Sequence, residues 1–130
     1  MRKLLFSTIL IAFATVAYNQ TTPCNDLPIA SPEVKATAEN ADAYLQEHLP
    51  TSIGATENTH GVFKASIDCD GVVGTVTYQT GEMTDQQAND MIDVIKNLNF
   101  TAAQNGGENV KTFVFISLKI SAGQASCGIN

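Results

Sequence analysis

The chain has 130 residues, of which 13 are acidic and seven are lysine or arginine, so its formal net charge at pH 7 is −6. This length allows a single domain with one modest core. The few, scattered basic residues disfavour nucleic acid and anionic membrane surfaces as partners, because both need clustered lysine and arginine side chains.

The first residues have the pattern of a secretory signal peptide. Arg2 and Lys3 precede an apolar run of about 14 residues that ends in small side chains, whereas a bilayer-spanning helix needs roughly 20. We therefore expect a leader over residues 1–19 that is cleaved on export, so that the mature chain begins at Tyr18 or Gln20 and keeps no membrane anchor. The mature protein would be periplasmic or secreted, with a net charge of about −8 after loss of the leader.

A helix is predicted over residues 31–49, within an N-terminal extension that spans residues 20–59. Ser31 can cap free backbone N–H groups, and Pro32 suits the first helical position. From Val34 onward, apolar residues recur at three- and four-residue steps, which is typical of one buried helical face. Pro50 ends this pattern, and a polar loop follows.

Two strands joined by a tight turn are predicted next. Residues 61–69 alternate apolar and polar side chains, as a half-buried strand does, and Asp70-Gly71 is a strong signal for a two-residue hairpin. With this dipeptide at the centre of the turn, the predicted pairs are Cys69 with Val72, Ile67 with Gly74, Ala65 with Val76, and Phe63 with Tyr78. The apolar residues of both strands then share one face.

A second helix and a third strand complete the predicted elements. Thr84 and Gln87 have the spacing of a capping box, and the apolar spacing that follows predicts an amphipathic helix of about 13 residues. Residues 110–121 then alternate as a long strand. One side carries Val114, Ile116, Leu118 and Ile120, and the other carries Phe113, Phe115, Ser117 and Lys119. Residues 122–130 form a tail that we expect to be loosely held unless Cys127 is bridged.

These elements predict an α+β fold with two layers. The economical arrangement is a three-stranded antiparallel sheet in the order 2-1-3, with both helices on one face. In this order the third strand lies at an edge of the sheet, with half of its main-chain polar groups unpaired. Such an edge is either masked or free to bind an extended peptide as an added strand.

Three cysteines leave one thiol over if a single disulfide forms within the chain in an oxidising compartment. We prefer a bond between Cys24 and Cys127, because Cys69 lies at the hairpin tip, away from the end of the third strand. A dimer linked through the odd cysteine is the alternative. His48 and His60 stand apart from the cysteines, so we expect no metal and no cofactor.

No residue spacing predicts a catalytic site. A small hydrolase or redox enzyme would need Cys69 or Ser66 as the nucleophile and His60 or Asp68 as the base, but the sequence does not join these residues into a constellation. We therefore expect that the protein is not an enzyme.

The second half of the chain carries a pattern of spaced glycines, an Asp-Gly turn and apolar alternation. Its members are residues 61–71, Thr80, Gly81, Ala88, Phe100, Ala103, Gly106 and Val110. In this pattern, residues 60–121 resemble the carboxy-terminal domain of the TonB energy-transducer family, whose strand–strand–helix–strand order agrees with the order predicted above. Members of that family bind the amino-terminal peptide of an outer-membrane transporter beside the last strand of the domain.

The resemblance implies that the partner is a protein or an extended peptide, such as that of an outer-membrane receptor. The peptide-binding residues would be those of the last strand, namely Val110, Thr112, Val114, Ile116, Leu118 and Ile120. The alternative is a structural or dimeric secreted protein in which this edge is masked. The chain lacks the proline-rich arm of the family, so we do not expect coupling to an inner-membrane motor.

Overall fold

The computed structural model describes residues 23–130, so the predicted leader over residues 1–19 lies outside the described part. The fold is α+β, as the sequence predicts. Its elements are η1 (Cys24–Asp26), α2 (Ala41–Glu47), β1 (Thr59–Ile67), β2 (Val73–Gly81), α3 (Asp85–Ile95), β3 (Ala103–Asn105), β4 (Glu108–Val110), β5 (Thr112–Ser121) and β6 (Gln124–Ile129).

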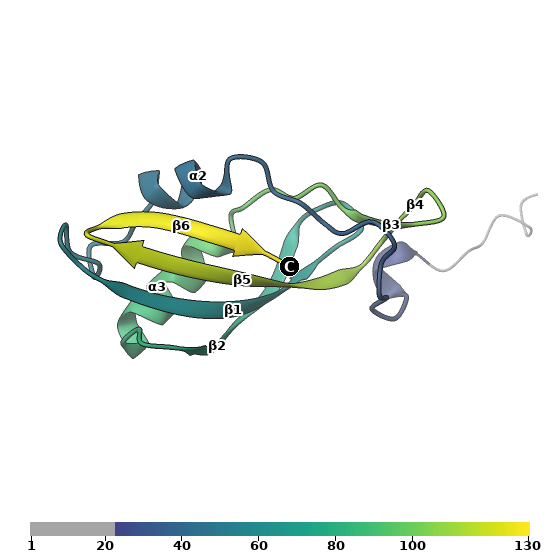
Figure 1. Ribbon diagram of the computed structural model, residues 1–130. Helices are drawn as coiled ribbons and strands as arrows, with labels where there is room; N and C mark the ends of the chain where they lie inside the picture. Colours follow the sequence, from purple (N-terminus) through teal and green to yellow (C-terminus); the bar gives the residue numbers. More distant parts are fainter. Residues whose placement is uncertain (1–22) are drawn as a thin grey trace, which may run out of the picture.

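The main sheet has four antiparallel strands in the order β2-β1-β5-β6, and β3 pairs with β4 in a separate two-stranded sheet (Figure 1). The predicted order 2-1-3 is present, but the prediction that the sheet stops there is wrong. Residues 122–130, which we expected to be loosely held, supply the fourth strand. They do so because the outer side of β5 offers unpaired N–H and C=O groups, which β6 takes up from Ile116 to Ser121.

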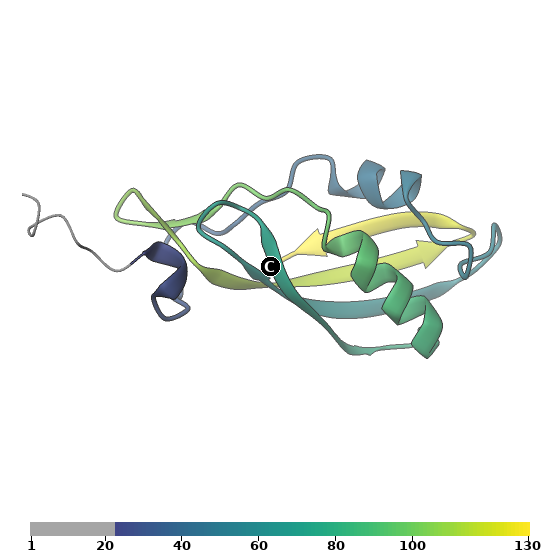
Figure 2. The ribbon, with the colours of Figure 1, turned by 180° about the vertical axis from the view of Figure 1, so that it is seen from behind.

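The core lies between one face of the sheet and the two α-helices. Helix α3 passes behind the sheet in Figure 1 and in front of it in Figure 2, while α2 lies along β6. Leu45 of α2 and Met91 and Ile95 of α3 are fully buried. They join the same cluster as the inward side chains of the sheet, which include Phe63, Ala65, Ile67, Val114, Ile116, Leu118 and Ile120. Helix α3 therefore covers one face of the sheet, as predicted, whereas α2 lies beside β6 at the edge of the sheet and contributes Leu45 to the same core.

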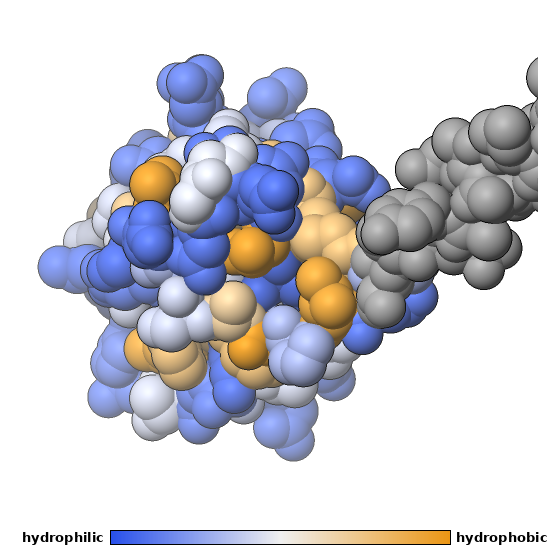
Figure 3. Space-filling view, turned by 90° about the vertical axis from the view of Figure 1, so that its right-hand side faces the viewer, coloured by the Kyte–Doolittle hydropathy of each residue, from blue (hydrophilic) through white to orange (hydrophobic). Residues whose placement is uncertain are grey.

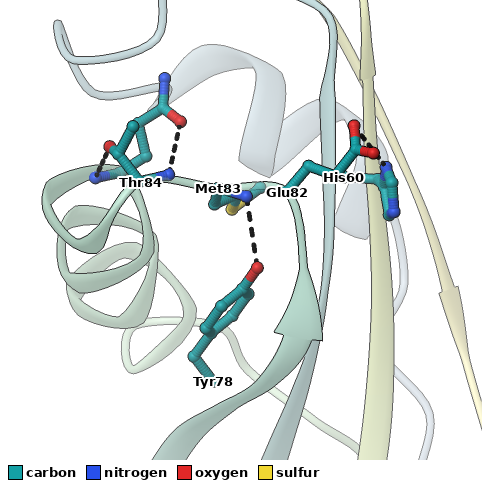
Figure 4. A network of polar contacts seen from close by, with 6 residues as sticks. His60, Tyr78, Glu82, Met83 and Thr84 are labelled. Atoms are coloured by element: carbon teal, nitrogen blue, oxygen red, sulfur yellow. Dashed lines mark hydrogen bonds and ion pairs between the residues drawn. The ribbon is translucent and has the colours of Figure 1, made fainter.

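Helix α3 begins with the predicted capping box. The Thr84 hydroxyl accepts a hydrogen bond from the Gln87 main-chain N–H at 3.2 Å, and the Gln87 side-chain oxygen accepts one from the Thr84 N–H at 3.1 Å (Figure 4). The Gln87 amide also donates to the Glu57 carboxylate at 2.7 Å. These contacts satisfy the first N–H groups of the helix and connect it to the loop before β1.

The β1–β2 hairpin forms at the predicted turn, with a shifted register near its tip. Ala65 pairs with Val76 and Phe63 with Tyr78, as predicted. The predicted pairs Cys69–Val72 and Ile67–Gly74 are wrong, because Val72 accepts from the N–H of Asp68 and Ile67 pairs with Val73. The cause is a bulge in β2, where the Ser66 hydroxyl accepts a hydrogen bond from the Thr75 N–H at 2.8 Å.

The prediction of a helix over residues 31–49 is wrong for its first half. Only Ala41–Glu47 is helical, and residues 31–40 run alongside the segment that follows α3. Val34 and Gln104 exchange both main-chain hydrogen bonds, at 3.0 and 2.9 Å. These non-local bonds replace those that a helix would have made. Asn40 then adopts a left-handed conformation, with φ of 55°, immediately before α2.

The disulfide joins Cys24 to Cys69, so the preferred Cys24–Cys127 pairing is wrong. The N-terminal segment lies against the tip of the β1–β2 hairpin. There the Asn25 side-chain oxygen accepts from the Cys69 N–H at 2.9 Å, and the Asn109 side chain donates to the Cys69 carbonyl at 3.0 Å. Cys127 lies in β6, at the opposite edge of the sheet, and remains a free thiol.

Candidate functional site

The predicted peptide-binding strand is not a free edge. β5 pairs with β1 along Thr112 to Ile120 and with β6 from Ile116 to Ser121, and Phe115 exchanges two further hydrogen bonds with Asn130, at 2.8 and 3.0 Å. The prediction that β5 presents an open side is therefore wrong over most of its length. The residues whose backbone was expected to bind the peptide also point their side chains inward on this strand, and the buried ones are Thr112, Val114, Ile116, Leu118 and Ile120. Val110 lies outside β5, at the end of β4.

The outer edge of β6 is covered in turn by α2. The Asp42 carboxylate accepts a hydrogen bond from the Cys127 N–H at 2.8 Å, and the Gln46 side-chain oxygen accepts one from the Ala125 N–H at 2.5 Å. The Gln46 amide also donates to the carbonyl of Gly123 at 3.1 Å. Asp42 and Gln46 are one helical turn apart and so face the strand together. Their side chains take the place of a neighbouring strand and mask this edge.

The face of the sheet opposite the helices is bare and carries two exposed phenylalanine rings. Phe113 and Phe115 alternate with the buried residues of β5 and are 41% and 43% exposed. The Lys64 ammonium lies 4.1 Å from the centre of the Phe113 ring, a cation–π contact. Directly opposed residues of antiparallel strands point to the same side. We therefore define the aromatic face by the outward residues paired between β1 and β5: His60, Val62, Lys64, Ser66, Phe113, Phe115, Ser117 and Lys119.

A groove of about 440 Å³ lies at the far end of the aromatic face, and its lining includes Val62, Ser117 and Lys119. His60, opposite Lys119 in the register, faces Glu82 across the groove, with Nδ1 3.8 Å from the carboxylate oxygen (Figure 4). Both side chains of this pair are well exposed, so water screens their attraction. The groove thus carries one lysine, one histidine and one carboxylate among its lining residues.

Apolar side chains are also exposed at the end of the molecule formed by η1, β3 and β4, as Figure 3 shows. They include Leu27 and Val34, which are 47% and 57% exposed. A smaller cleft of about 260 Å³ lies there, between Leu27, Pro28 and Val110. In contrast to the aromatic face, this region carries no pair of neighbouring aromatic rings among its described residues.

Of the candidate catalytic residues, Ser66 and Asp68 lie close together, on the same side of the hairpin above Gly74. Cys69 is held in the disulfide, and the Ser66 hydroxyl is buried and bonded to the Thr75 N–H. His60 lies six residues from Ser66 on the same strand, a separation of about 20 Å. Within residues 23–130, no group of three His, Cys, Asp or Glu side chains is arranged to hold a metal ion.

Cys127 borders a cleft of about 470 Å³ between β6 and residues 36–43. Burial raises the pKa of its thiol to about 12, and the hydrogen bond and negative charge of Asp42 act in the same direction. The thiol is therefore protonated at neutral pH and is a poor nucleophile.

Comparison of the chain with protein-family models, with curated proteins and with solved structures finds no match. The resemblance of residues 60–121 to the TonB family therefore stays a prediction. Among residues 23–130, no helix is long and apolar enough to cross a membrane.

Sequence reasoning placed Phe113 and Phe115 on the outer side of the last strand but gave them no role. The signal was present, because a half-buried strand normally alternates apolar with polar residues. Here bulky apolar residues occupy both sides of the first half of β5. That departure from simple alternation marks the aromatic face.

Proposed function

We propose that the protein is an exported, non-catalytic protein-interaction module whose aromatic face binds an extended segment of a partner protein. The observation that carries the proposal is the exposure of Phe113 and Phe115 on a sheet face that no helix covers. Covering the exposed part of one such ring stabilises an assembly by about 1 kcal/mol, because full burial contributes about 1.5–3 kcal/mol and each ring is already more than half buried. Aromatic side chains are also enriched among the residues that contribute most to binding at protein interfaces.

Export is supported by the predicted leader and by the Cys24–Cys69 disulfide, since disulfides form and persist mainly in oxidising compartments. The resemblance to the TonB family favours the periplasm and a partner in the outer membrane. A role without catalysis is supported by the disulfide that occupies Cys69, by the hydrogen bond that occupies the Ser66 hydroxyl, and by the distance of His60 from both residues.

A second candidate function is the binding of an extended peptide along an edge strand. The strand that offers an edge for it is β2, because β5 is paired on both sides. β2 is the terminal strand at the side of the sheet away from α2, and it contains no lysine or proline that would discourage pairing. However, two register shifts interrupt its pairing with β1 and leave residues 76–78 as the regular stretch. Bulges of this kind protect edges, so the aromatic face is the stronger candidate.

A selection from a library of displayed 12-residue peptides tests the proposal. The bait is the purified protein, and peptides that also bind the variant Phe113→Ser/Phe115→Ser are removed. The matched control is Leu27→Ser/Val34→Ser, which removes two apolar side chains of similar exposure elsewhere. We expect selected peptides to bind the native protein and the control alike, and to shift the amide NMR signals of β1 and β5.

Three results would count against binding on the aromatic face. Peptides that bind the phenylalanine variant equally well would show that the rings are not involved. Shifts centred on residues 76–78 would move the site to the β2 edge. A native protein that dimerises in sedimentation, while the phenylalanine variant stays monomeric, would assign the face to self-association and favour the structural alternative.

A further inference from the structure

The charge of the main sheet is opposite in sign to that of the whole chain. None of the residues of β1, β2, β5 and β6, all of which the structure describes, is Asp or Glu, although the chain has 13 acidic residues. These strands carry two lysines, Lys64 and Lys119, and both lie on the aromatic face. A chain with net charge −6 therefore places two lysines beside its exposed phenylalanines, while the carboxylates of Asp68 and Glu82 border the face at its two ends.

The acidic residues of the helices do not cancel this local charge. Helix α3 contains Asp85, Asp90 and Asp93, and it lies on the other side of the sheet. A helix packs about 10 Å from the sheet that it covers, and the Debye length is about 8 Å at physiological salt. A ligand on the aromatic face therefore interacts chiefly with the charges of that face.

Resting on the proposed function, we infer that the partner segment is acidic, with carboxylates that contact Lys64 and Lys119 and apolar side chains that cover Phe113 and Phe115. Lys64 is already placed for this contact, because its ammonium lies over the Phe113 ring. An apolar residue that covers the ring brings a neighbouring carboxylate into reach of the ammonium. The partially desolvated cation then gains an ion pair in addition to its contact with the ring.

The spacing of the two lysines sets a pattern for the partner. Lys64 is opposite Phe115, and Lys119 lies four residues further along β5, a separation of about 13 Å between the two levels. In an extended peptide, every second residue points to the same side, so residues i and i+4 are separated by the same length. The matching segment has acidic residues at i and i+4, and its apolar residues at i−2 and i+2, at the levels of Phe113 and Ser117, lie on either side of Phe115.

Other occupants fit this face less well. Nucleic acid and anionic membranes require more than two lysines, and the net charge of the chain repels both. In a symmetric pair of aromatic faces, four lysines would share the interface, whereas the carboxylates of Asp68 and Glu82 lie at its margins. An acidic segment of a different protein is the occupant whose charge complements the face.

Three synthetic peptides with this pattern, differing only at positions i and i+4, test the inference by fluorescence anisotropy. They carry Glu, Gln or Lys at both positions. We expect the Glu peptide to bind about tenfold more tightly than the Gln peptide, because two partly exposed ion pairs each contribute a factor of about two to five. The Lys peptide should bind most weakly.

The variant Lys64→Gln/Lys119→Gln should lose this preference for the Glu peptide. The control Lys35→Gln/Lys96→Gln changes the net charge of the protein by the same amount at sites outside the sheet, and it should keep the preference. The comparison therefore separates contacts on the aromatic face from a general effect of net charge.

The outcomes distinguish the inference from the proposed function. If all three peptides bind equally, and binding is lost in Phe113→Ser/Phe115→Ser but not in the lysine variant, the acidic pattern is wrong and the proposed function stands. If the Lys peptide binds best, the inference is overturned. If no peptide binds and the signals of β1 and β5 do not shift, peptide binding on this face is itself refuted.

Discussion

Replacing Gly71 with alanine should destabilise the protein by about 3 kcal/mol more than replacing Gly106 with alanine. Both glycines have positive φ, of 80° and 58°, so both substitutions force a side chain into the left-handed region. That cost is about 1–2 kcal/mol, and the reduced entropy of the unfolded chain offsets about half of it. At Gly106 no further cost arises, because the new Cβ would meet open space.

At Gly71 the new Cβ would overlap with the main-chain carbonyl oxygen of Phe100. The carbonyl cannot move aside freely, because Phe100 is buried and its N–H donates to the Gly71 carbonyl at 3.1 Å. Relieving the overlap strains the packing at a cost of about 1–3 kcal/mol. It also weakens this hydrogen bond, which contributes about 1 kcal/mol.

Urea denaturation followed by far-ultraviolet circular dichroism, with the disulfide intact, measures the difference between the two variants. The slope of the unfolding free energy against urea should be the same in both, so that the midpoints can be compared directly. If the two variants differ by less than about 1 kcal/mol, the close approach of the hairpin tip to Phe100 does not limit the substitution, and this reasoning is refuted.

Further predictions concern the cysteines and the covered edge. Cys69→Ser should lower the unfolding free energy by about 4 kcal/mol, because the disulfide closes a loop with a sequence separation of 45, and a reductant should then have no further effect on the variant. Because the pKa of the Cys127 thiol is raised in the folded state, the stability that this thiol contributes is complete below about pH 9 and is lost as the pH rises towards 12. Thiolate absorbance at 240 nm should rise over the same pH range. The variant Asp42→Asn should shift the midpoint of this thiol titration to lower pH. Gln46→Ala should destabilise the protein by about 1 kcal/mol and accelerate hydrogen exchange of the Ala125 amide; unchanged exchange would show that α2 does not protect this edge.

The elements that the sequence predicted well are those specified by neighbouring residues. The capping box of Thr84 and Gln87 and the apolar spacing after it were enough to predict α3. The Asp-Gly turn was enough to predict the hairpin, and alternation was enough to predict the buried side of β5. In each case the local preference and the tertiary contacts favour the same structure.

The elements that the sequence did not predict depend on distant partners. β6 reads Gln-Ala-Ser-Cys-Gly-Ile, with few residues of high strand propensity, and it forms because β5 provides a hydrogen-bonding template. Residues 31–40 carry a good helix start, but pairing with residues 101–104 prevails over that preference. The disulfide was mispredicted for the same reason, since the position of Cys24 depends on where this N-terminal segment crosses the hairpin.

The error in the candidate site follows from the missing strand. Without β6, β5 is an edge, and its backbone is the natural place for a peptide. With β6 present and α2 beside it, the exposed groups that remain on β5 are side chains, above all Phe113 and Phe115. The aromatic face was visible in the alternation of β5, but its exposure depends on which side of the sheet the helices cover.

β6 is held on both of its sides, and the residue after it, Asn130, exchanges two further hydrogen bonds with Phe115. A protease needs several residues in a free, extended form before it can cleave a chain. It could obtain them here only by peeling β6 from both β5 and α2. We therefore expect β6 of the folded protein to resist proteolysis.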